Sequence, residues 1–373
     1  MRSWIRSHPR KVVLLLVGGM ILGYVGYQAV ASVMAFNRIA SEEFDPAEAA
    51  QAMQEPAPTT TLVVNGPEEA PTVPAPRYER LEAERLMESR DLEQGDSFSV
   101  PYAVSPPLPD DMFESILLIG SDASGFLADV IIDVLLPADG SNPIVFSIPR
   151  DLYLLDECDG GYSRANAALG GCRGVASGPE LLALTVQRFT GIEVDHYVRV
   201  DFDGFKTVID RMGGVTICVG DTPVRDVKAH LEIGAGCHHV GGETALAWVR
   251  SRSPEKLIDG QWVAVGGSDF LRQRRQQDLL FQLADKLASY STVASLASAL
   301  ENLASAVRMD SGWSIWEVAQ LGFRYRGLDR DEVIRLSIPT EDYRTGAGAQ
   351  VLLPTESFNR VLGEVYPPAR LTP

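Results

Sequence analysis

The sequence predicts an α/β fold: a layered α-β-α domain with a central mixed sheet, preceded by one transmembrane helix and a linker. Three observations predict this arrangement. Short, continuous apolar runs are typical of strands that are buried on both faces. These runs alternate with segments of helical periodicity, which is typical of helices layered on a sheet. A long uncharged apolar run near the N-terminus is typical of a membrane-spanning helix.

The first 36 residues predict a cytoplasmic tail, residues 1–11, followed by a membrane anchor, residues 12–36. Four of the first eleven residues are Arg or Lys, and the anchor contains no charged residue. About two dozen apolar residues are enough to cross a bilayer, and flanking basic residues hold their side in the cytoplasm. The rest of the chain is therefore expected outside the cell, attached to the cell membrane by a single pass. Small residues at Ala29 and Ala31 leave removal of this segment as a signal peptide open.

Residues 37–110 predict an acidic linker rich in Pro and Ala, in which residues 78–92 could form a short helix. Such a composition buries little apolar surface and favours an extended chain. Part of this linker could still pack on the folded extracellular domain, which is expected to comprise residues 111–373.

The folded domain is expected to begin near Met112 and to contain strands and helices in alternation. The apolar runs predict strands at 115–120, 130–136, 144–148, 196–200, 215–219 and 333–338. Helical periodicity predicts helices at 166–169, 179–189, 202–212, 242–250, 269–289, 291–307, 313–323 and 354–365. Pro179 suits a first helical turn, Gly213 ends a helix, and Ser268 or Asp269 can cap the long helix.

The four cysteines, Cys158, Cys172, Cys218 and Cys237, support an extracellular location. An even number of cysteines in an exported chain indicates disulfide bonds. Three pairings are possible, and we favour Cys158–Cys172 with Cys218–Cys237 because neighbouring cysteines close short loops in turn-rich sequence. A zinc site is the alternative, but no pair of cysteines has the C-x-x-C spacing that such sites favour.

Charge and motifs exclude several classes of function. The formal net charge of −17 argues against a nucleic-acid-binding protein, which normally presents a basic face. The sequence contains neither G-x-G-x-x-G nor G-x-x-x-x-G-K-[S/T], which removes the commonest nucleotide-binding sites. An acidic, anchored, extracellular chain is also a poor candidate for a transcription regulator.

Charged residues are concentrated at the ends of the predicted strands and helices. Asp122 and Asp129 follow the first strand, and two carboxylates plus substrate phosphates suit Mg²⁺. Gln276 follows Arg272 by one helical turn, near the positive end of its helix. Arginine offers paired donors that fit phosphate oxygens, and the arginines in question are Arg150, Arg250, Arg252, Arg272 and Arg275. Together these residues predict a site for a metal-bound pyrophosphate.

Each of these residues also has a purely structural explanation. Asp122 could cap a turn, and Arg150 could form a surface ion pair with Asp151. Arginines at the end of a helix could simply stabilise its dipole. The arginines that open the long helix could belong to a solvated, charged first turn.

Eight short sequence words, in order, resemble the LytR–CpsA–Psr family of membrane-anchored cell-wall phosphotransferases. They are ILLIGSD at 116–122, SIPRD at 147–151, RANAA at 164–168, IEVDHY at 192–197, VDFDGF at 200–205, DRMGGV at 210–215, ALAWVRSR at 245–252 and DFLRQRRQQ at 269–277. The resemblance covers about residues 115–287. It implies that a glycopolymer, of the teichoic acid, capsule or arabinogalactan type, is transferred from a polyprenyl-diphosphate carrier to peptidoglycan through a phosphodiester. It also implies that arginines and Mg²⁺ hold the pyrophosphate.

Carried over residue by residue, the resemblance implies three sets of site residues. The catalytic set is Arg150, Arg250, Arg252, Asp269, Arg272 and Gln276. The substrate-binding set is Arg164, Asn166 and Arg275, of which Arg164 and Asn166 could equally be structural. The metal ligands are Asp122 and Asp129. Arginine forks and Mg²⁺ would stabilise charge on the phosphate oxygens, and Asp129 or Asp269 could accept the proton of the attacking sugar hydroxyl.

The chain departs from the family in the loop that joins the first two strands. Leu127 stands where the family usually has an arginine, and Ser124 replaces a second one. Arg164 or Arg274 could compensate for the loss. Otherwise the chain could be a non-catalytic wall scaffold that binds polyprenyl-linked glycans. A polyprenyl-pyrophosphate hydrolase with the same site is a further alternative.

Overall fold

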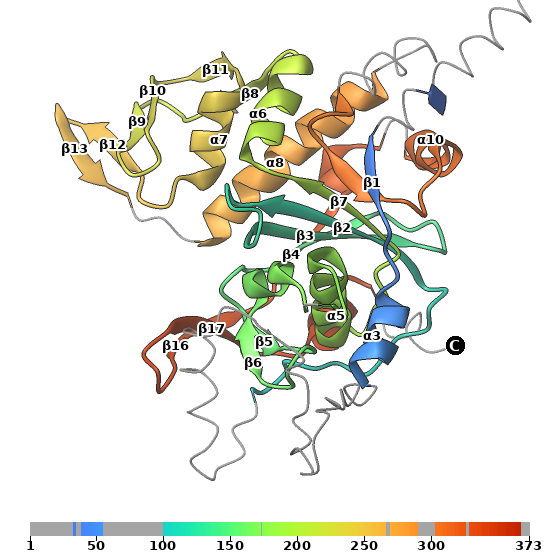
Figure 1. Cartoon of the computed structure of the whole chain (residues 1–373). Coiled ribbons are helices and arrows are strands. Elements are labelled where there is room, and N and C mark those ends of the chain that lie inside the picture. Colours follow the sequence, from blue (N-terminus) through green and yellow to red (C-terminus); the bar gives the residue numbers. More distant parts are fainter. Residues whose placement is uncertain are drawn as a thin grey trace, which may run out of the picture. The chain divides into compact units, whose positions relative to one another are not determined.

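The computed structural model in Figure 1 describes residues 33–34, 39–54, 100–172, 174–265, 269–289, 303–325 and 328–366. The chain divides into two compact units, each described here by itself. Unit 1 comprises Met1–Ser41, Asp203–Arg308 and Trp313–Gly327, and unit 2 comprises Glu42–Phe202, Met309–Gly312 and Leu328–Pro373. The predicted anchor lies outside the described residues, apart from two positions. No helix among the described residues is both long and apolar enough to cross a bilayer.

Unit 2 is built around a mixed sheet of seven strands. Their order is β1 (Ala40–Glu42), β14 (Arg308–Asp310), β7 (His196–Val200), β2 (Phe113–Ser121), β3 (Ala128–Pro137), β4 (Ile144–Ser147) and β15 (Ile334–Leu336). The central strand β2 runs parallel to β7 and antiparallel to β3. At the other edge, β15 runs parallel to β4. The predicted mixed sheet and α/β fold are therefore present, and four of the apolar runs form the inner strands β2, β3, β4 and β7. The run at 333–338 forms the edge strand β15, the run at 215–219 lies in a separate small sheet, and the inner strand β14 was not predicted.

One face of this sheet is covered by α5 (Gly178–Thr190) (Figure 1). The 3₁₀ helix η1 (Ala165–Gly170) and α11 (Phe358–Val365) contribute to the same apolar core. The rings of Phe146, Phe189 and Phe358 meet there, with centroids 4.9 to 6.2 Å apart. Full burial of each such ring contributes about 2 kcal/mol or more. This apolar layer makes a rigid base for the loops at the strand ends.

The bounds of α5 follow from its own sequence. Ser177 caps the helix in a capping box with Glu180, and Pro179 lies in the first turn. Gly191 ends it in the left-handed conformation, with φ of 77°. A Cβ at Gly191 would lie 2.2 Å from the carbonyl oxygen of Pro106, so this close approach needs glycine.

Part of the predicted linker packs on unit 2. Its described residues include the strand β1 and the helix α3 (Pro46–Gln54). The ring of Phe44 lies 5.0 Å from that of Tyr197, whose hydroxyl donates to Glu42 at 2.9 Å. The possible helix at 78–92 lies outside the described residues, as do residues 291–302 of another predicted helix.

Several short elements were absent from the sequence prediction. Unit 2 also contains β5 (Tyr153–Leu155), β6 (Tyr162–Arg164), β16 (Thr340–Arg344), β17 (Gln350–Pro354) and the 3₁₀ helix η2 (Arg330–Glu332). The predicted helix at 354–365 was therefore too long, since residues 350–354 pair with β16 instead. The four strands are short, and their register is set by a partner strand rather than by their own periodicity.

Unit 1 contains four described helices and two small antiparallel sheets. The helices are α6 (Phe202–Arg211), α7 (Gly242–Arg250), α8 (Asp269–Ala288) and α10 (Ile315–Arg324). One sheet pairs β8 (Val215–Cys218) with β11 (Cys237–Val240), and the other has the order β10 (Leu231–Ile233), β9 (Val224–Asp226), β12 (Glu255–Ile258) and β13 (Gln261–Ala264). Both favoured disulfides are present, Cys158–Cys172 in unit 2 and Cys218–Cys237 in unit 1.

Candidate functional site

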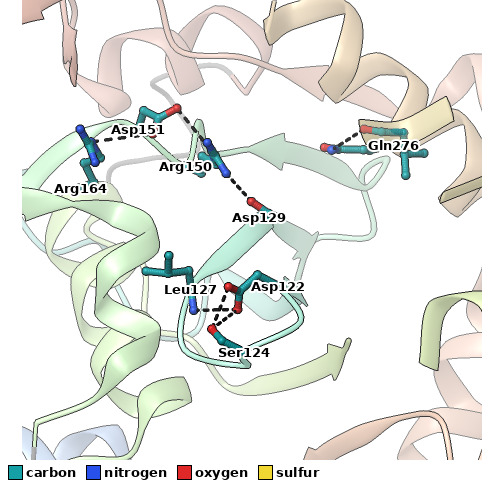
Figure 2. A network of polar contacts seen from close by, with 9 residues as sticks. Asp122, Ser124, Leu127, Asp129, Arg150, Asp151, Arg164 and Gln276 are labelled. Atoms are coloured by element: carbon teal, nitrogen blue, oxygen red, sulfur yellow. Dashed lines mark hydrogen bonds and ion pairs between the residues drawn. The ribbon is translucent and has the colours of Figure 1, made fainter. Parts of the chain in front are cut away.

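The loop that follows β2 holds Asp122 as an anion. Ser124 Oγ donates to both carboxylate oxygens of Asp122 at 2.8 Å, and the Leu127 amide donates at 3.3 Å (Figure 2). Burial acts to raise the pKa of Asp122, but these hydrogen bonds lower it overall. The loop therefore keeps a negative charge at the end of a central strand.

A β-bulge directs Asp129 toward Arg150. In the β2–β3 ladder Gly120 pairs with Val130 and Ser121 pairs with Ala128, so Asp129 is the extra residue. A bulge re-aims the side chain that it carries. Asp129 Oδ1 accepts a hydrogen bond from Nη1 of Arg150, which follows β4 (Figure 2). The sequence placed these two residues at strand ends, and the bulge brings them into contact.

Arg150 is held by a second carboxylate on its other side. Its Nε donates to Asp151 at 3.4 Å, and its side chain remains 27% exposed. Burial disfavours the charged form, but Asp151 and Asp129 outweigh it and raise the pKa of Arg150. Arg150 is thus a permanent cation with a solvent-facing edge that can meet an anionic ligand.

Arg164 and Asn166 support the segment that carries Arg150. Arg164 donates from Nε and Nη2 to the Gln350 carbonyl at 3.2 Å, and its Nε lies 3.8 Å from Asp151. Asn166 is buried, and its backbone amide donates to the Arg150 carbonyl at 3.0 Å. The structure therefore joins Asp129, Arg150 and Arg164 into one chain of contacts through Asp151, a residue that sequence reasoning treated only as an alternative partner.

In unit 1, Arg250 and Arg252 are exposed on either side of a buried Ser251. The turn that carries them is fixed by Asp226, which is 1% exposed. Asp226 Oδ2 accepts from Ser251 Oγ and from the Ser253 amide, each at 2.8 Å. Sequence reasoning missed Asp226 because its partners lie 25 and 27 residues further along the chain.

The first half of α8 is bonded to the end of α7. Arg275 Nη1 donates to the Ser251 carbonyl at 3.2 Å, and its guanidinium lies 4.1 Å from the centroid of the Trp248 ring. Burial lowers the pKa of Arg275, an effect that Asp226 partly offsets. Gln276 Nε2 donates to the Val249 carbonyl at 3.4 Å. These contacts give Arg275 and Gln276 a structural role, in addition to any contact with substrate.

The other charged residues in the first half of α8 differ in how exposed their side chains are. Arg272 is 5% exposed, so its own side chain is not solvated as the alternative of a charged first turn requires. Arg274 is exposed, and Asp269 is the first residue of the helix.

The predicted site residues therefore fall into two groups. Unit 2 holds Asp122, Asp129, Arg150, Arg164 and Asn166, and unit 1 holds Arg250, Arg252, Asp269, Arg272, Arg275 and Gln276. Within unit 2 the bulge and Asp151 connect the charged residues. Within unit 1 Ser251 connects the two arginine-bearing segments.

The carboxylates of unit 2 fit Mg²⁺ only with help from a ligand. Among the described residues no group of three or more His, Cys, Asp or Glu side chains could hold a metal ion. Mg²⁺ commonly takes one or two carboxylates and completes its shell with phosphates and water. The anionic Asp122 and the bulged Asp129 provide such hard oxygen donors, so a site that is completed by substrate phosphates is compatible with them.

Three comparisons with known proteins agree with one another. A sequence model of the LytR_cpsA_psr family matches residues 82–363. The probable cell wall biosynthesis protein LcpB of Corynebacterium glutamicum is 31% identical over 243 residues, which are 62% of this chain and 54% of that protein. The polyisoprenyl-teichoic acid–peptidoglycan teichoic acid transferase TagV of Bacillus subtilis is 30% identical over 229 residues, 59% of this chain and 53% of that protein. The chain thus spans about half the length of these relatives.

The fold is also that of a solved relative. The crystal structure of B. subtilis TagV matches with a TM-score of 0.56 at 27% identity, over 71% of this chain and 100% of that chain.

Proposed function

This chain belongs to the LytR_cpsA_psr family, and we therefore propose that it transfers a cell-wall glycopolymer from a polyprenyl-diphosphate carrier to peptidoglycan. The polymer is of the teichoic acid, capsule or arabinogalactan type, and the bond formed is a phosphodiester. The observation that carries this proposal is Arg150, a permanent cation that follows β4 and is held between Asp129 and Asp151. The named activity of the relative TagV supports the same class of reaction.

In the proposed reaction a peptidoglycan sugar hydroxyl attacks the phosphorus that is linked to the glycan. A new P–O bond forms to that hydroxyl oxygen, and the P–O bond to the carrier breaks. The polyprenyl phosphate leaves with the electron pair, and the hydroxyl proton passes to a carboxylate, Asp129 or Asp269. Arg150 donates to the non-bridging oxygens, where negative charge increases in the transition state.

The other charged residues keep their predicted roles as part of this proposal. Arg250, Arg252, Arg272 and Gln276 contact the diphosphate, with Arg164, Asn166 and Arg275 contributing to substrate binding. Asp122 and Asp129 would hold Mg²⁺, whose charge would offset that of the phosphates.

We also propose the cellular setting that this reaction needs. Residues 12–36 anchor the chain in the cell membrane with the N-terminus in the cytoplasm, so that the folded part meets its lipid-linked donor and the wall outside. The two disulfides support an extracellular location, because such bonds persist in oxidising compartments.

The proposal is tested by glycan transfer with the full chain in detergent micelles. A synthetic polyprenyl-diphosphate glycan and a peptidoglycan fragment are supplied with Mg²⁺, and the linked product is measured by mass spectrometry. Arg150→Ala is expected to lower kcat/KM about 100-fold or more, because one preorganised donor is lost. Arg150→Lys keeps the charge but loses the fork, so it should retain partial activity.

Arg360→Ala is the matched control for the loss of one positive charge in unit 2. Arg360 pairs with Glu356 on the exposed side of α11, and its removal should leave transfer unchanged. Binding of the lipid without any transfer would favour the scaffold. Release of carrier lipid without the peptidoglycan fragment would instead favour the hydrolase.

A further inference from the structure

The loop between β2 and β3 presents apolar side chains where the family resemblance implies positive charge. Phe126 is 61% exposed and Leu127 is 40% exposed. Neither side chain can bind a phosphate. A diphosphate that approaches Asp122 would therefore meet a carboxylate and two apolar groups, unless another element supplies a cation.

Such a cation is present on the neighbouring strand. Arg199 belongs to β7, where it stands in register beside Ile119 of β2. Its Nη2 donates to the Gly125 carbonyl at 2.6 Å, which places the guanidinium against the loop that carries Asp122 and Leu127. Arg199 is separated from Gly125 by 74 residues, so no local sequence pattern reveals this contact.

The backbone of the loop is shaped to admit this guanidinium. Gly125 has a φ of +75°, and a Cβ built there would lie 2.9 Å from Nη2 of Arg199. Glycine therefore serves two purposes at this position, because it permits both the left-handed conformation and the close approach of Arg199.

Most donors of Arg199 remain available for a ligand. A guanidinium has five N–H donors, and within the described parts of the chain Arg199 has a single hydrogen bond and no carboxylate at ion-pair distance. Arg150 differs, since it lies between Asp129 and Asp151. A half-buried arginine whose charge no carboxylate balances is suited to an anionic ligand.

One of the two residues that the sequence offered as compensation is bonded elsewhere in unit 2. Arg164 is bonded to the Gln350 carbonyl and lies near Asp151. Arg199 instead contacts the loop itself.

We propose that Arg199 binds a phosphate oxygen of the lipid diphosphate and so supplies the positive charge that Leu127 lacks. This inference rests on the proposed function only for the identity of its ligand, a prenyl diphosphate. It predicts that charge at position 199 and charge at position 127 can replace each other.

The test measures binding of farnesyl diphosphate with Mg²⁺ to the full chain in detergent by calorimetry. Arg199→Gln is the informative variant, because its amide can still donate to the Gly125 carbonyl while the charge is lost. Its Kd is expected to rise about tenfold, the ratio typical of one lost charge-assisted hydrogen bond. Arg199→Lys should restore most of the affinity.

Arg344→Gln is a matched control. Arg344 also lies in unit 2 and donates from Nε to a glycine carbonyl, that of Gly348, at 3.2 Å. The Kd of the Arg344→Gln variant for farnesyl diphosphate should equal that of the wild type. Thermal unfolding of each variant shows whether the fold is retained.

The double variant Leu127→Arg with Arg199→Gln is the decisive arm. Recovery of wild-type Kd would support the inference, because the second arginine then restores the missing charge. A Kd for Arg199→Gln within twofold of the wild type would overturn it. An equal loss of affinity for farnesol, which has no phosphate, would overturn it as well.

The same measurements separate this inference from the proposed function. If the wild type binds the diphosphate through Arg199 but transfers no glycan, the proposed function fails and the inference stands. If the wild type transfers glycan and Arg199→Gln does so with unchanged KM, the inference fails and the proposed function stands. If the wild type binds no diphosphate, both are overturned.

Discussion

Asp133 is a buried carboxyl group on β3, an inner strand of the central sheet. It is 0% exposed on β3, and Ser115 Oγ donates to its Oδ1 at 2.7 Å. No hydrogen-bond partner for Oδ2 is found among the described residues. Burial raises the pKa of Asp133 to about 7, against the effect of Ser115 and with a contribution from Asp195. The group is therefore neutral in the folded protein at mildly acidic pH, as a buried position requires.

This raised pKa makes stability depend on pH in a definite direction. Between about pH 4 and pH 7 the folded chain holds a proton on Asp133 that the unfolded chain loses. The contribution of this group to stability therefore falls as pH rises through about 7. Asn cannot ionise. As pH rises from 4 to 8, the Tm of Asp133→Asn should therefore increase relative to the Tm of the wild type, whatever constant difference the substitution itself causes. Thermal unfolding across this range measures the difference in Tm.

Asp342→Asn provides the matched control, because Asp342 is an exposed residue of β16. The difference in Tm between the Asp342→Asn variant and the wild type should stay nearly constant with pH. Parallel Tm profiles for Asp133→Asn and the wild type would contradict the assignment of a raised pKa.

In unit 1, the turn after α7 depends on the carboxylate of Asp226, which belongs to strand β9. Asp226 on β9 accepts from Ser251 and Ser253, and its Oδ1 accepts from the amides of Lys228 and Ala229 at 3.0 and 3.2 Å. Burial acts to raise its pKa, but these bonds lower it overall. Asp226 thus positions the turn that carries Arg250 and Arg252, without lying in the arginine-bearing segments itself.

Asp226→Asn should destabilise this turn, because the amide nitrogen cannot accept and would face backbone donors. A loss of about 2 kcal/mol in the free energy of unfolding is expected for such a buried group. The pKa of Asp226 is lowered in the fold, so its contribution is present above the unfolded value and is lost as pH falls. Chemical denaturation at pH 7 and at pH 3 measures both effects. Glu232→Gln, exposed on the adjacent strand β10, should change neither.

Across the molecule as a whole, each unit contains one disulfide in a different environment. Cys158 and Cys172 are 3% and 1% exposed, inside the core of unit 2. Cys218 and Cys237 are exposed and join paired strands, β8 and β11. Access of the attacking thiolate controls the rate of thiol–disulfide exchange. The two bonds should therefore differ in their resistance to a reductant.

Under native conditions a dithiol should reduce Cys218–Cys237 first and leave Cys158–Cys172 intact until the protein unfolds. Alkylation at successive times followed by mass spectrometry identifies which cysteines react. The same reaction in a denaturant is the internal reference, because both bonds are then equally accessible. Equal rates in the native protein, or faster reduction of the buried bond, would contradict this expectation.

Much of the fold was predictable because its causes are local. The apolar runs of β2, β3 and β7, the capping box of α5 and the glycines that end helices all act within a few residues. The family was predictable too, because its eight words are short contiguous segments in a fixed order, and the family model confirms it. The short strands β9, β10 and β12 escaped prediction, since polar residues interrupt them and they lack the continuous apolar run that revealed β4.

Local patterns in the chain were enough to predict the fold class, the favoured disulfide pairing and the residue types at the candidate site. Which of those residues contact one another is determined only by the tertiary structure. The ion pair of Asp129 with Arg150 and the contact of Arg199 with Gly125 join residues that are 21 and 74 positions apart. Such contacts depend on strand order and register, which no single segment encodes, and for that reason the charge partners of the site emerge only in the folded chain.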